Sequence, residues 1–84
     1  MTKFVYFAWV RERIGIGEEE IELPADVKTG DDLMAWLKTR GENYEMALEH
    51  SNAIRIAVNQ EHIHHSETLG NAKEIALFPP MTGG

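Results

Sequence analysis

One amphipathic helix stands between segments that have the character of strands, and this order restricts the possible folds severely. The helix is predicted over residues 31–40, where three large apolar residues recur at the i, i+3, i+4 spacing of one helix face: Leu33, Trp36 and Leu37. Thr29 is a suitable N-cap, and Asp31 and Asp32 add negative charge to the first turn. A weaker helical turn is expected over residues 44–50.

Alternating β-branched and aromatic residues predict strands before and after this helix. The strand-like segments are residues 3–10, 18–23, 53–58, 61–65 and 74–78. In a chain of 84 residues, this order predicts an α+β fold of the β-grasp (ubiquitin-like) type, with a mixed sheet wrapped around one main helix. The first and last strands would lie side by side and parallel. We expect one domain over residues 1–78, followed by an extended tail over residues 79–84.

The first strand is apolar on both alternating faces, which predicts a second apolar surface besides the core. The strand residues expected to pack against the helix are Phe4, Tyr6, Ile54, Ile56, Val58, Ile75 and Leu77. The apolar residues left on the outer face are then Val5, Phe7, Trp9, Ala57, Ala76 and Phe78. Exposed patches of this kind usually mark a partner site, and the aromatic residues Phe7, Trp9 and Phe78 are the expected anchors.

Composition disfavours several classes of function. The chain has no cysteine, and therefore no disulfide, thiolate metal site or thiol nucleophile. Its net charge of -6 and the lack of a basic stripe disfavour nucleic acid and anionic membranes as partners, and favour a basic protein surface. The sequence has no apolar stretch long enough to span a membrane and no secretory signal pattern, so we expect a cytoplasmic protein.

Three short motifs have plain structural interpretations. Gly15 and Gly17 lack the other residues of a phosphate-binding loop and are expected in a turn. The glutamates at 18–20 point alternately to opposite faces of a strand, so they are expected to be solvated. His62 and His64 share one side of a strand, but without a second cluster they do not predict a metal site.

The ending "ALFPPMTGG" suggests a tail that enters another protein. Pro79 and Pro80 would start an extended stem, and the six residues to Gly84 would reach about 20 Å. Gly83 and Gly84 have no Cβ, so the end of the chain is thin, and its only reactive group is the terminal carboxylate. Because a carboxylate is a poor acyl donor, an external ATP-dependent enzyme would have to activate it as an acyl adenylate.

Three motifs together resemble the small subunit of molybdopterin synthase, the MoaD family: the start "KFVYFAWVRE", the internal "AVNQ" and the ending "ALFPPMTGG". The resemblance spans the whole chain. It implies a sulfur carrier whose terminal glycine, here Gly84, is adenylated by a MoeB-like activating enzyme and converted to a thiocarboxylate. The tail would then enter a MoaE-like large subunit and deliver sulfur to a cyclic pterin phosphate precursor.

The resemblance also implies site residues. Gly84 would carry the sulfur, and the threaded segment would be Pro79, Pro80, Met81, Thr82 and Gly83. Phe7, Arg11 and Phe78 would contact partners, the outer-face pattern adds Trp9 to them, and His62 is expected at the same contact surface. His62 stands where an apolar contact is expected, which bears on partner affinity. The chain itself would bind no cofactor, since ATP is used by the activating enzyme.

Two other functions remain open from the sequence. The chain could be a different ubiquitin-like carrier, either a sulfur donor for thiazole synthesis or a modifier joined to lysines. It could also be a plain binding module that uses the Phe7 and Phe78 face. The ending and the length favour the molybdopterin carrier over another ubiquitin-like carrier. An inert tail would favour the binding module.

Overall fold

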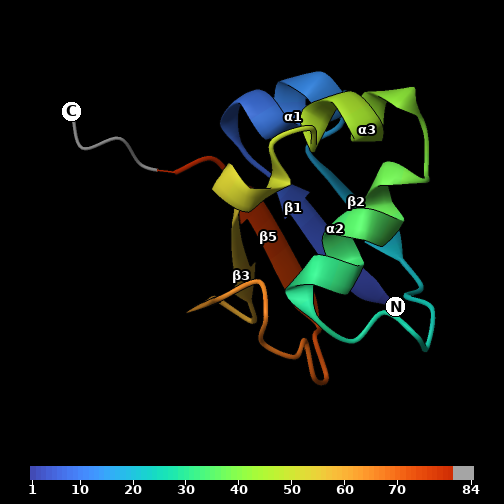
Figure 1. The fold of residues 1–84 in the computed structure, drawn as a ribbon, viewed down its shortest axis with the longest axis vertical. Helices are drawn as coiled ribbons and strands as arrows, with labels where there is room; N and C mark the ends of the chain where they lie inside the picture. Colours follow the sequence, from blue (N-terminus) through green and yellow to red (C-terminus); the bar gives the residue numbers. More distant parts are fainter. Residues whose placement is uncertain (81–84) are drawn as a thin grey trace.

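The computed structural model describes residues 1–80 (Figure 1). The expectations for Met81, Thr82, Gly83 and Gly84 lie outside the described residues. The elements, in chain order, are β1 (Thr2–Tyr6), α1 (Ala8–Ile14), β2 (Glu18–Ile21), α2 (Gly30–Lys38), α3 (Glu42–Ala47), a short 3-10 turn η1 (Ser51–Ala53), β3 (Arg55–Val58), β4 (Glu61–Ile63) and β5 (Glu74–Phe78).

The five strands form one mixed sheet in the order β2-β1-β5-β3-β4. β1 and β5 are parallel, and the other three neighbouring pairs are antiparallel. Figure 1 shows α2 lying across the sheet, and α1 and α3 side by side at the end where β5 runs towards the C-terminus. The predicted β-grasp fold and its central parallel pair are therefore confirmed.

The core lies between the sheet and the helices. The strand residues predicted to face inward are all buried, as are Leu33 and Leu37 of α2. Trp36, predicted beside them, is only half-buried, and the Arg40 guanidinium lies 5.6 Å from the centroid of its ring. No helix among residues 1–80 is long and apolar enough to cross a membrane.

The predicted start of α2 is confirmed in detail. The Thr29 hydroxyl accepts a hydrogen bond from the Asp32 backbone N–H at 3.2 Å, and the Asp32 carboxylate accepts one from the Thr29 N–H at 3.2 Å. This reciprocal capping box satisfies donors that a helix N-terminus leaves without partners. The N–H bonds from Lys28 and Thr29 to that carboxylate lower the pKa of Asp32.

The predicted first strand over residues 3–10 is wrong at its end, because β1 stops at Tyr6 and α1 follows. The Phe7 N–H still donates to the Leu77 carbonyl at 3.1 Å, but the Phe7 carbonyl accepts the N–H groups of Val10 and Arg11 at the start of α1. Ala8 turns the chain with a φ of 50°, in the left-handed region. Trp9 therefore lies on a helix and not on the outer face of the sheet.

Packing explains why this segment is helical. Val10 and Ile14, four residues apart, are both buried on one side of α1, and Trp9 packs against the same core. Gly15 ends the helix with a φ of 99°, which favours glycine, so the turn predicted at Gly15 and Gly17 connects α1 to β2. A strand over the same residues would have placed Trp9 on the open side of the sheet.

The prediction that Glu19 is solvated is also wrong. It lies opposite Phe4 in the β1–β2 register, on the core side, and its side chain is 17% exposed. Its Oε2 accepts hydrogen bonds from the hydroxyls of Tyr6 at 2.7 Å and Tyr44 at 2.6 Å, and lies 3.1 Å from Nη1 of Arg40. These four residues, called the Glu19 network below, join β1, β2 and α3.

The titration of the network follows from its contacts. Burial raises the pKa of Glu19, but the hydrogen bonds from Tyr44, Tyr6 and Arg40 and the charge of Arg40 outweigh burial, so the net pKa is lowered. Burial and the Glu19 carboxylate raise the pKa of Tyr44 to about 12 and raise that of Tyr6 further. Glu19 is therefore ionised and both tyrosines are neutral hydrogen-bond donors near pH 7.

Candidate docking face and tail base

Three predicted contact residues meet on the outer face where β5 ends. The rings of Phe7 and Phe78 are 6.4 Å apart and nearly perpendicular, at 84°. The His62 ring lies 5.1 Å from the Phe78 ring. Phe7 is 48% exposed, which is unusual for a phenylalanine, and Phe78 is half-buried. We call Phe7, Phe78 and His62 the aromatic patch.

The small side chain of Ala57 allows this contact. His62 lies opposite Ala57 in the β3–β4 register, while Phe78 lies opposite Arg55 on the other side of β3. The two rings therefore lean towards each other over Ala57, which is only 7% exposed although it lies on the outer face. The predicted position of Ala57 is right. Its expected exposure is wrong because larger neighbouring side chains cover it from solvent.

Arg11 and Trp9 lie on α1, beside the aromatic patch and not within it. Arg11 is an exposed residue of α1, and its guanidinium packs over Gly17. A Cβ added at Gly17 would lie 3.1 Å from Nε of Arg11. Trp9 is half-buried, with the Arg13 guanidinium 4.6 Å above its ring. The structure thus places Arg11 where a partner on the patch could reach it and gives Trp9 a packing role. Their contacts with a partner stay predictions.

The described part of the tail continues from the aromatic patch. Pro79 and Pro80 follow Phe78 directly, and both are half-buried. Neither has an N–H group, so β5 cannot extend through them, and the chain leaves the sheet there. In Figure 1 the chain leaves the end of β5 beside α1. The exit of the tail is therefore bordered by the aromatic patch.

The strand register arranges the outer face in rows across the sheet. The central row, from β2 to β4, is Glu18, Val5, Ala76, Ala57 and His62. The row on the side away from the tail consists of Glu20, Lys3 and Glu74. The row nearest the tail pairs Phe78 with Arg55. The face thus changes from mainly acidic at one end to aromatic and basic beside the tail.

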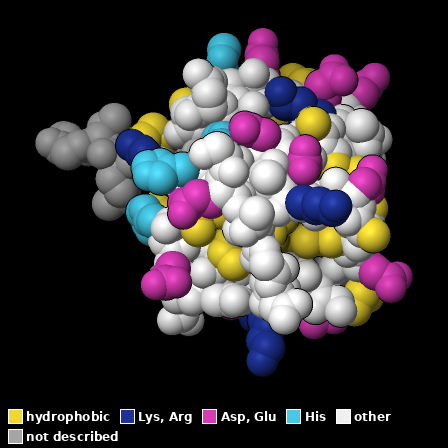
Figure 2. Space-filling model, turned by 60° about the horizontal axis from the view of Figure 1, so that its bottom comes forward, with side chains coloured by type: hydrophobic (Ala, Val, Ile, Leu, Met, Phe, Trp, Pro, Cys, Tyr) yellow, Lys and Arg dark blue, Asp and Glu magenta, His cyan; other side chains and the backbone are white. Residues whose placement is uncertain are grey.

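A shallow hollow of about 300 Å³ lies at this basic end. Its lining consists of Arg55, Ile56, His62, Ile63, His64 and Glu67. Figure 2 shows histidine side chains gathered near basic and apolar ones at the left edge of the view. Among residues 1–80, no group of three or more His, Cys, Asp or Glu side chains could hold a metal ion.

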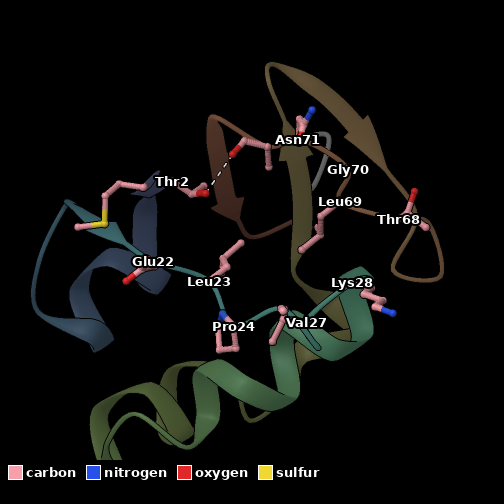
Figure 3. Close-up of a pocket in the computed structure, with 13 residues that line it drawn as sticks. Thr2, Glu22, Leu23, Pro24, Val27, Lys28, Thr68, Leu69, Gly70 and Asn71 are labelled. Atoms are coloured by element: carbon pink, nitrogen blue, oxygen red, sulfur yellow. Dashed lines mark hydrogen bonds between the residues drawn. The ribbon is translucent and has the colours of Figure 1, made fainter.

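Another groove is separate from the tail base. It has a volume of about 550 Å³ and is formed by the start of β1 and the loops at residues 22–28 and 68–72 (Figure 3). Glu22 and Lys28 are the only ionisable side chains in its described lining, and both are exposed. The Thr2 hydroxyl, also in the lining, donates to the Ala72 carbonyl at 3.0 Å. The groove has no group poised to activate a carboxylate.

Arg55 is the residue of this face that the sequence reasoning missed. The alternation in "AIRIAV" places Arg55 on the same side as Ala57, so the same reasoning that found the outer face contains the signal. Its proximity to His64 and His62 depends on the β3–β4 hairpin and could not be read from one segment. The geometry as a whole places an exposed aromatic and basic surface beside Pro79 and Pro80.

The whole chain is similar to proteins of a known family. The model of the ThiS family matches residues 4–84. Proteins named molybdopterin synthase sulfur carrier subunit from Haemophilus influenzae and Escherichia coli are each 34% identical over 84 residues, covering all of both chains. The human protein of that name is 30% identical, covering 99% of this chain and 93% of its own.

Two solved structures are also similar. A Pyrococcus furiosus protein, described as a candidate molybdopterin converting factor subunit 1, has a TM-score of 0.71 and 32% identity, with 95% of this chain and 97% of that chain covered. The small archaeal modifier protein 1 of Haloferax volcanii has a TM-score of 0.66 and 25% identity, with the same coverage of both chains.

Proposed function

The chain belongs to the ThiS family, and we propose that it is the sulfur carrier subunit of a molybdopterin synthase. The full-length match to carriers of that name, which runs through the tail to Gly84, is the observation that carries the proposal. The identity to these carriers, 34%, exceeds the 25% identity to the archaeal modifier, which favours sulfur transfer over conjugation. A synthase subunit requires a large subunit as its partner.

The proposed chemistry takes place at the carboxyl carbon of Gly84. In a MoeB-like activating enzyme, the Gly84 carboxylate attacks the α-phosphate of ATP and releases pyrophosphate, which leaves an acyl adenylate. A sulfur nucleophile at the oxidation level of sulfide then attacks the acyl carbon, and AMP leaves with the electron pair of the carbon–oxygen bond, which gives the thiocarboxylate. This enzyme and ATP are outside the chain, which supplies the carboxylate and the surface that positions it. Both steps are expected in the cytoplasm.

Delivery requires the tail to enter the active site of a MoaE-like large subunit. There the thiocarboxylate sulfur forms a bond to a carbon of the cyclic pterin phosphate while a bond from that carbon to oxygen breaks and the oxygen keeps the electron pair. Water then cleaves the carbonyl–sulfur bond and returns the Gly84 carboxylate. Two such deliveries supply the dithiolene of molybdopterin. The aromatic patch beside Pro79 is the docking surface that holds the carrier while its tail is inserted.

The test is to change the position of the terminal carboxylate by one residue. One residue added after Gly84 puts the reacting carbon into a peptide bond, and deletion of Gly84 shortens the reach by about 3.3 Å, a large error for a near-attack geometry. Both variants should lose adenylate formation with the activating enzyme and sulfur transfer to the pterin precursor. Gly84→Ala should keep partial activity, because it retains the carboxylate.

In a matched control, the residue that the test adds after Gly84 is added before Met1 instead, and Met1 is 82% exposed. This extension should leave activity unchanged, and every variant should still fold and bind the large subunit. Full activity in the protein extended after Gly84 would refute the carrier function. An intact mass that shows one oxygen exchanged for sulfur, in protein isolated from its own cells, would identify the thiocarboxylate directly.

A further inference from the structure

Arg55 carries a charge that the fold does not use. It lies on the outer face of β3, is exposed, and forms no ion pair with another residue in the range 1–80. A guanidinium is ionised throughout the physiological pH range. By contrast, Lys3 on the same face is 3.5 Å from Glu18, and Arg40 is held in the Glu19 network. The charge of Arg55 is therefore available for an external group.

The position of Arg55 links that charge to docking. Its cross-strand neighbour is Phe78, and His62, which contacts Phe78, also lines the hollow at Arg55. A protein that covers the aromatic patch must therefore cover Arg55 as well. Burying an unpaired guanidinium is strongly unfavourable, so a partner that binds here has to supply an anionic group opposite it.

On this basis, which rests on the proposed function, we infer that Arg55, with His62 and His64, forms a recognition site for a carboxylate side chain of the large subunit. A carboxylate can accept two parallel hydrogen bonds from a guanidinium, and the exposed histidine rings line the same hollow. Of the two isoleucines in the lining, Ile56 faces the core and is only 1% exposed and Ile63 is half-buried, so the accessible side chains of the hollow are mainly polar. Glu67, also in the lining, accepts a hydrogen bond from the His64 N–H at Oε2 and forms no ion pair with Arg55.

The charge order of the face gives this site a role in orientation. Glu18, Glu20 and Glu74 lie in the rows away from the tail, whereas Arg55 lies beside it. A partner with an acidic group near the tail entrance and basic groups at the far end would dock in one direction only. Reversed docking would place like charges together, which disfavours it. Recognition at Arg55 would therefore align the tail with the active site entrance.

The experiment measures the dissociation constant of the full chain for the large subunit by titration calorimetry at low salt. Arg55→Glu should weaken binding by at least about tenfold, and Arg55→Gln should lie between it and the wild type. The control Lys73→Glu makes the same change in net charge at an exposed site before the other end of β5, and should change binding by no more than about twofold. At high salt the Arg55→Glu penalty should shrink.

The outcomes separate this inference from the proposed function. If the wild type does not bind the large subunit, the proposed function fails. If the wild type binds but Arg55→Glu binds equally well, only the recognition site is refuted. The same holds if Lys73→Glu loses as much affinity for the large subunit as Arg55→Glu does. Thermal unfolding checks that each variant is folded, and Arg55→Gln replaces Arg55→Glu in this comparison if the latter is unfolded.

A second measurement identifies the partner group. Acidic residues of the large subunit are replaced by lysine one at a time. At least one replacement should restore binding to Arg55→Glu while it weakens binding to the wild type. A scan without such a residue would overturn the assignment of a carboxylate to this site.

Discussion

Replacing Glu19 by alanine tests whether the Glu19 network stabilises the fold. The Glu19 carboxylate accepts hydrogen bonds from Tyr6 and Tyr44 and faces Arg40 at 3.1 Å, with side-chain exposures of 17% for Glu19 and 29% for Arg40. Glu19→Ala leaves two tyrosine hydroxyls without their acceptor, one of them on a residue that is 1% exposed. The network therefore cannot be fully replaced by water.

The magnitude follows from the bonds that are lost. Hydrogen bonds to a charged group contribute about 1.5–3 kcal/mol each, so the loss of two predicts about 3–6 kcal/mol. Arg40 and the partly accessible Tyr44 can be rehydrated, which favours the lower end, about 3 kcal/mol. That corresponds to a fall in Tm of about 12–24 °C for a domain of this size. A loss of about 3 kcal/mol is a large part of the free energy of unfolding expected for the whole domain, which is about 4–13 kcal/mol.

Urea unfolding followed by far-UV circular dichroism measures this change. The matched control is Glu18→Ala on the same strand, whose ion pair with Lys3 joins side chains that are 64% and 47% exposed. Exposed pairs contribute little, so Glu18→Ala should cost less than about 1 kcal/mol. A Glu19→Ala loss no larger than that of Glu18→Ala would refute the stabilising role of the network.

Phe7→Ala or Phe78→Ala should weaken binding of the large subunit by about 1–3 kcal/mol in calorimetry with little change in Tm, and a folded variant with wild-type affinity would remove the aromatic patch from the interface. Thr29→Ala should lower the free energy of unfolding by about 1 kcal/mol in urea and Thr29→Ser should restore most of it; equal stabilities would mean that the capping box is not effective. Because the pKa of Glu19 is lowered from 4.5, its stabilisation is complete above that value and is lost as the pH falls through the lower folded pKa. Acid titration of Glu19→Gln should lack this part of the pH dependence, and an unchanged profile would contradict the argument.

The sequence alone determined the features that depend on local periodicity and chain ends. Alternation predicted the strands after α2 and the inward face of β5, and the Thr29 cap with the apolar spacing of residues 31–40 predicted α2. The order of these elements was sufficient for the β-grasp fold. The motif "ALFPPMTGG" carries part of the resemblance to the family, because a motif depends on residue types and not on tertiary contacts.

Only the tertiary structure decided the segments whose pattern fits two conformations. Residues 7–14 are apolar enough for a strand, but Val10 and Ile14 also have helical spacing, and burial of both against the core selects the helix. Glu19 has the type of a solvated residue, yet its acceptor atoms meet hydroxyls from β1 and α3, which are 13 and 25 residues away. The hollow beside Arg55 likewise exists because β3 lies between β4 and β5. Such contacts join residues distant in the chain, so no local pattern encodes them.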